Sequence, residues 1–89
     1  MNHEGFEVYL RNIGLETELE IREVISRASW VETTMDISLD RMQKSEIEDQ
    51  KFKESLLELI GSPEKTEAFY QALCSYMDYY SSQQVSENI

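Results

Sequence analysis

The feature that most constrains this fold is the spacing of its apolar residues. They recur every three or four positions, as in amphipathic helices, and turn or capping residues divide them into separate runs. The first run contains Phe6, Tyr9, Leu10 and Ile13, and Gly14 then supplies a left-handed stop. No run of alternating apolar and polar residues is long enough to predict a useful strand. The chain is therefore predicted to be all-α.

The second predicted helix spans residues 17–34. Thr17 and Glu20 form the T-x-x-E pattern of a capping box, in which each side chain bonds a free backbone N–H of the first turn. Apolar residues on two sides of this helix indicate either a central helix or an exposed apolar patch, and the central, buried position is the preferred interpretation. Residues 35–42 then break the rhythm, which predicts a well-packed connection with about one helical turn.

The third predicted helix begins at a second capping-box pattern, Ser45 with Glu48, and ends at Gly61. Ser62 and Pro63 restart the chain at once as a cap and a first helical residue. The fourth helix is predicted to fade near residue 82, and residues 83–89 are predicted to be a disordered tail.

Together these signals predict a single compact four-helix domain, residues 1–82, around one core. A domain of this size has a marginal core, so homodimerisation is one way to stabilise it. Nine side chains are expected to be mostly buried: Ile21, Val24, Ala28, Phe52, Leu56, Leu59, Phe69, Leu73 and Tyr76.

Charge narrows the functional classes. Eight Lys and Arg stand against 18 Asp and Glu, for a net charge of -10. This field repels polyanions, so duplex DNA is an unfavourable ligand. One cysteine, the absence of a signal-peptide pattern and the lack of a long apolar stretch lead us to expect a soluble cytoplasmic protein with no membrane partner.

The sequence lacks the combinations of residues that most catalytic sites need. His3 and Cys74 are the only His and Cys and stand far apart, whereas a structural zinc site needs about four such ligands. The three glycines are dispersed, so no phosphate-cradling loop is expected. Acidic clusters fall at predicted helix starts, where capping and the helix dipole explain them. We therefore expect no catalytic, metal or cofactor site and no enzymatic activity.

Four residues are candidates for an interface. Trp30 and Leu19 lie far around the second helix from its main apolar stripe, and Tyr70 and Tyr79 lie on the two shoulders of the fourth helix's stripe. A half-buried aromatic ring with a wet polar end is typical of an interface anchor. Burial in the core is the competing interpretation for each.

The order of elements resembles the core-binding, SAM-like N-terminal domain of the tyrosine recombinases and phage integrases. The similar patterns, covering residues 5 to 81, are Phe6-x-x-Tyr9-Leu10 before Gly14-Leu15, Ser26-Arg27-Ala28-x-Trp30-Val31-Glu32 leading to Ile37-Ser38-Leu39-Asp40, Phe52-x-x-x-Leu56-Leu57, and Phe69-Tyr70-x-Ala72-Leu73-x-x-Tyr76-x-x-Tyr79-Tyr80. The resemblance implies an orthogonal helical bundle and a DNA-gripping function. The chain departs from the family in charge, because the last helix carries Lys65 as its one cation against Glu64, Glu67 and Asp78.

Three hypotheses follow. The leading one is a small acidic binding module or regulator that engages a basic surface on a partner protein. A DNA mimic that occupies the nucleic-acid channel of an enzyme is a sharper variant of this hypothesis. The second is DNA binding of the integrase type through the cluster Lys44, Lys51 and Lys53, and the third, a small enzyme, would need a cofactor or metal that the sequence gives no means of holding.

Overall fold

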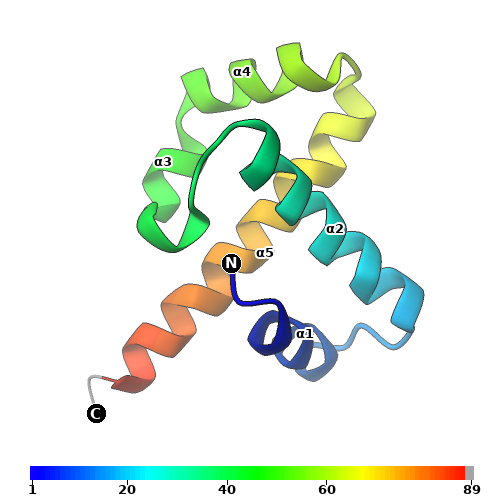
Figure 1. Cartoon of the computed structure of the whole chain (residues 1–89), viewed down its shortest axis with the longest axis vertical. Helices are drawn as coiled ribbons and strands as arrows, with labels where there is room; N and C mark the ends of the chain where they lie inside the picture. Colours follow the sequence, from blue (N-terminus) through cyan, green and yellow to red (C-terminus); the bar gives the residue numbers. More distant parts are fainter. Residues whose placement is uncertain (88–89) are drawn as a thin grey trace.

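The computed structural model describes residues 1–87, with side chains through residue 83, and this part of the chain is all-helical with no strand. Figure 1 shows α5 crossing the molecule, with α1 and α2 on one side of it and α3 on the other. The elements are α1 (His3–Asn12), α2 (Glu18–Thr34), the 3-10 helix η1 (Leu39–Arg41), α3 (Lys44–Glu48), α4 (Gln50–Ile60) and α5 (Pro63–Glu87). The all-α prediction is confirmed, with one helix more than expected.

The N-terminal half follows the predicted capping pattern. Thr17 is extended and its hydroxyl accepts the backbone N–H of Glu20 at 3.2 Å, so α2 begins where the capping box predicted. Asn2 caps α1 in the same way by accepting the N–H of Gly5 at 3.1 Å. After α2, Asp36 turns the backbone with a positive φ of 53°, and η1 supplies the single helical turn expected in the connection.

The predicted third helix is wrong in its start and its continuity. Ser45 lies inside α3, and Asp49 adopts an extended conformation (φ -62°, ψ 135°) that separates α3 from α4. The Asp49 carboxylate accepts the backbone N–H of Lys51 at 2.9 Å and so caps α4. A short Asp side chain competes with the helix for backbone hydrogen bonds, which explains the break.

The turn between α4 and α5 matches the prediction. Gly61 adopts the left-handed conformation (φ 81°) and donates its N–H to the carbonyl of Leu57 at 2.7 Å. Ser62 caps the next helix through the N–H of Lys65, and Pro63 is its first residue. Helix α5 then runs to Glu87, past the end predicted near residue 82, and residues 88–89 of the predicted tail lie outside the described residues.

The core gathers around α5, which contacts α1, α2, η1, α3 and α4. Five of the nine predicted core residues are buried, namely Ile21, Ala28, Leu56, Leu73 and Tyr76. Val24, Phe52 and Phe69 pack against the core and are half-buried.

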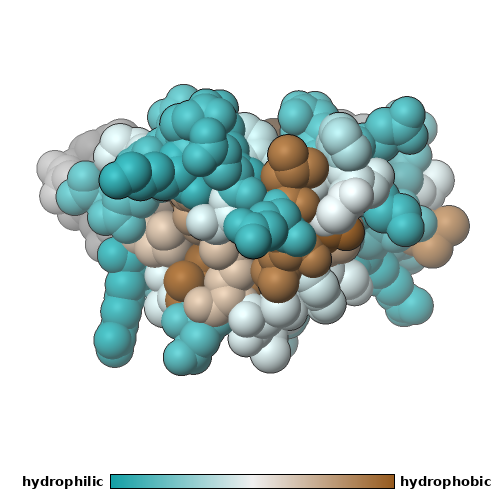
Figure 2. Space-filling view, turned by 90° about the horizontal axis from the view of Figure 1, so that it is seen from above, coloured by the Kyte–Doolittle hydropathy of each residue, from teal (hydrophilic) through white to brown (hydrophobic). Residues whose placement is uncertain are grey.

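The prediction for Leu59 is wrong, because 45% of its surface is exposed. Helix α4 packs on α3 and α5, and no comparable contact joins it to α2 within the described residues, so one side of α4 stays open. Figure 2, viewed from the α4 end, shows hydrophobic residues exposed among hydrophilic ones at this end of the molecule.

A tyrosine joins distant parts of the chain. The hydroxyl of Tyr76 donates to the carboxylate of Asp40 on η1 and accepts the backbone N–H of Asn2 at 3.0 Å. Its ring meets Phe6 of α1 edge-on at a centroid distance of 5.0 Å. Burial, followed by the bond to Asp40, raises the pKa of Tyr76. The neutral phenol therefore ties α1 and η1 to α5.

Candidate protein-interaction groove

A groove runs between α1 and α2, and we call it the α1–α2 groove. Its first section lies between the two helices, and its second section continues along α2 toward Trp30. Three residues, His3, Ile25 and Ser26, line both sections, so the two form one continuous depression. The first section adds Glu4, Glu7 and Arg22, and the second adds Ser29, Trp30, Thr33 and Thr34.

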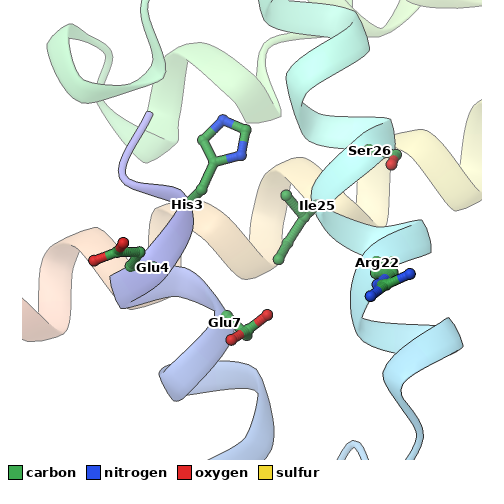
Figure 3. Close-up of a pocket in the computed structure, with 6 residues that line it drawn as sticks. All are labelled: His3, Glu4, Glu7, Arg22, Ile25 and Ser26. Atoms are coloured by element: carbon green, nitrogen blue, oxygen red, sulfur yellow. The ribbon is translucent and has the colours of Figure 1, made fainter.

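The side chains in the first section differ in direction. Figure 3 shows Ile25 and Glu7 directed into the space between α1 and α2, with Arg22 across from Glu7 and Glu4 on the far side of α1 in this view. Arg22 also lies 3.8 Å from the carboxylate of Glu18, one helical turn away. This end of the groove is therefore polar and charged, with an apolar floor at Ile25.

Trp30 lies in the second section of the groove. The preferred interpretation of this residue as core is wrong, because 41% of its surface is exposed. The indole packs against Phe69 of α5 in a T-shaped pair, with a centroid distance of 5.2 Å and an interplanar angle of 68°. His3, the first residue of α1, is the one residue of that helix that lines the groove beside Trp30. A large ring fixed on one side and open on the other has the form of an interface anchor.

Leu19 is also exposed, by 67%, but it does not belong to the groove. It lies in the first turn of α2, eleven residues before Trp30, which corresponds to about 16 Å along the helix axis. The structure therefore separates two candidates that the sequence placed on one apolar line.

Tyr70 is half-buried and is covered by its own chain. The ammonium group of Lys53 on α4 lies 4.9 Å from the centre of its ring, a cation–π contact. Desolvation is the main cause that raises the pKa of Tyr70 to about 12. This tyrosine helps to join α4 to α5.

Tyr79 is not available as an interface candidate, since 5% of its surface is exposed, and burial in the core, the competing interpretation, is the one that the structure shows. Its ring packs against Phe6, Tyr9 and Tyr76 at centroid distances of 5.5 to 5.9 Å. Helix α1 covers this shoulder of α5, and Gly5 allows the close approach: a Cβ at Gly5 would lie 2.9 Å from the Tyr79 ring carbon Cζ and closer still to the hydroxyl oxygen. A helical wheel of α5 alone does not contain this contact.

Apart from Trp30, the residues that line the groove were not predicted from the sequence. Ser26, Ser29 and Thr33 recur at three- and four-residue intervals on α2. Mixed small and polar residues at that spacing are also typical of a plain solvated helix face. The residue that could have indicated a binding site is Trp30, because a large aromatic side chain is not needed on a helix face that only contacts solvent.

Many of the cations are already engaged within the chain. Four of the eight Lys and Arg residues form ion pairs with carboxylates: Arg11, Arg22, Arg27 and Lys44. The hydrogen bond between Arg11 and Glu18 lowers the pKa of Glu18 and raises that of Arg11. In the lysine cluster considered for DNA binding, Lys44 pairs with Asp78 at 2.7 Å and Lys53 lies over Tyr70. The outward field is therefore mostly negative.

Reactive groups are sparse in the part of the chain that the structure describes. No three His, Cys, Asp or Glu side chains there are grouped so that they could hold a metal ion. Burial raises the pKa of the half-buried Cys74 thiol, which disfavours the nucleophilic thiolate.

Among residues 1–87, no helix is long and apolar enough to span a lipid bilayer. Comparison with known proteins gives no match: no family model, no curated protein and no solved structure is significantly similar to this chain.

Proposed function

We propose that this protein is a small, non-enzymatic binding module that engages the basic surface of a partner protein inside the cell. The observation that supports the proposal is a half-exposed tryptophan in a groove of a protein with net charge -10. Protein interfaces typically combine an aromatic anchor with a polar rim, and an opposite charge on the partner speeds association.

The fold proposed for this module is the SAM-like orthogonal bundle of the integrase core-binding domains. Its support is the sequence resemblance and the all-helical chain. DNA binding of the integrase type is the weaker function, because two of the three clustered lysines already contact Asp78 and Tyr70. Counterion release, which drives binding to duplex DNA, requires free cations.

Affinity capture from a nuclease-treated cell extract tests the proposal, with captured proteins identified by mass spectrometry. An unrelated helical protein of equal net charge is the control for simple ion exchange. We expect specific capture of a basic protein and its release by added salt. Capture of nucleic acid before nuclease treatment, with no specific protein afterwards, would contradict the proposal. Displacement of the captured protein by duplex DNA would favour the DNA-mimic form.

A further inference from the structure

We infer that the α1–α2 groove binds one amphipathic basic helix of a partner protein, about three turns long. The inference rests on the proposed function and specifies its site and the form of its ligand. The length of the groove, the side chains that line it and the structure of its walls support this ligand.

The length follows from α2, which forms one wall along the whole groove. The lining residues of α2 extend from Arg22 to Thr34, twelve residues apart, or about 18 Å at 1.5 Å per residue. A helix of about twelve residues has the same length. A single side chain inserted at Trp30 would leave most of the groove empty.

The walls select a helix over a strand. Helix α2 forms one wall along the whole groove, and α1 forms the other wall of the first section, with only its first residue, His3, beside the second. The backbone groups of both helices bond within their own helix, and the described residues contain no strand edge that an extended peptide could join. A groove between two helices receives the apolar face of a third helix through anchors at three- and four-residue spacing. Ile25 and Trp30 are the large apolar groups available to such anchors.

The two sections of the groove differ in the side chains that they offer to a ligand. No charged side chain lines the section that contains Ser29, Trp30, Thr33 and Thr34, so an apolar side chain fits there. Glu7 is directed into the other section, across from Arg22, which in turn lies 3.8 Å from the carboxylate of Glu18. Glu7 already lies 3.9 Å from Arg11, so the preference for a basic helix rests on the overall field of the protein, whose net charge is -10.

The test is selection from a display library of random twelve-residue helical peptides on the wild-type protein. Selected peptides should be basic, and their apolar residues should recur at three- and four-residue intervals. Binding should fall at least about tenfold when Ser26→Arg places a large cation in the middle of the groove, since tenfold is a modest loss for a blocked interface.

Ser55→Arg is the matched control, because Ser55 is likewise exposed and lies in the middle of a helix, α4. The same peptides should bind this variant as they bind the wild type, and circular dichroism should give both variants the wild-type helix content. Equal weakening by the two substitutions would show that charge alone drives binding and would overturn the groove assignment while leaving the proposed function in place. Failure to select any basic peptide would also overturn it, and the capture experiment would then test the proposed function separately.

Discussion

Replacing Gly5 by alanine should destabilise the protein, although alanine is the better helix former. Gly5 lies in the first turn of α1, where the gain in helix propensity is at most about 1 kcal/mol. The new Cβ would lie 2.8 Å from the side-chain nitrogen of Asn2 and 2.9 Å from Tyr79 Cζ. Tyr79 cannot swing away freely, because Phe6, Tyr9 and Tyr76 pack around its ring.

The magnitude follows from these two opposing effects. Overpacking a tight core site costs about 1–3 kcal/mol, and contacts this short place Gly5→Ala in the upper half of that range. After subtraction of the propensity gain, the free energy of unfolding should fall by about 1–2 kcal/mol. The melting temperature should then fall by roughly 5–15 °C for a domain of this size.

A double-mutant cycle with Tyr79→Phe isolates the contact. Tyr79→Phe alone loses the hydrogen bond from the Asn2 side chain, measured at 3.1 Å, which is worth about 0.5–1.5 kcal/mol. It also removes the hydroxyl oxygen, which is the atom nearest to the Cβ added by Gly5→Ala, so the double variant should be more stable than the sum of the two single effects predicts. Urea unfolding monitored by circular dichroism measures all four stabilities. A Gly5→Ala protein as stable as the wild type, or strictly additive effects, would refute the proposed packing of α1 on α5.

Four other outcomes are expected. Leu56→Ala should cost about 2–5 kcal/mol because Leu56 is fully buried, whereas Leu59→Ala should cost clearly less, and urea unfolding of both variants tests the open side of α4. Asp49→Ala should lower the free energy of unfolding by about 0.5–2 kcal/mol through loss of the α4 cap, while Ser45→Ala should change it by no more than about 0.5 kcal/mol. Equal losses would instead favour one continuous third helix that begins at Ser45. Folding raises the pKa of Tyr70 to about 12, above its unfolded value near 10. The stability that this phenol contributes is therefore complete below about pH 10 and is lost as the pH rises toward about 12. Tyr70→Phe should reduce that loss, which unfolding curves at alkaline pH would measure. Duplex DNA should not bind the protein near about 0.15 M salt. A dissociation constant below about 1 μM in a fluorescence titration would contradict the expected repulsion between DNA and the negatively charged protein.

Local signals predicted the helical elements well where a short motif decides the outcome. Thr17, Gly61 and Pro63 lie at helix boundaries as expected, because capping and left-handed turns depend on a few adjacent residues. The capping-box pattern at Ser45 failed for a related reason: Asp49 also caps, and the pattern does not say which of two competing caps the chain uses.

Tertiary contacts explain the remaining errors. Tyr79 lies on the shoulder of α5 in a helical wheel, but α1 covers that shoulder and makes it core. Leu59 fits the apolar stripe of α4 and still faces solvent, since α2 does not close over it. Neither outcome follows from periodicity within one helix, because each depends on where a distant helix packs.

Quenching of Trp30 fluorescence tests the central claim most directly, because this is the only tryptophan of the chain. The exposed indole should be quenched readily by neutral acrylamide and less by iodide, which the negative surface repels. Addition of a selected basic peptide should protect Trp30 from acrylamide in the wild type and in Ser55→Arg, but not in Ser26→Arg. A tryptophan that acrylamide cannot reach in the free protein, or equal quenching with and without bound peptide, would contradict the assignment of the α1–α2 groove.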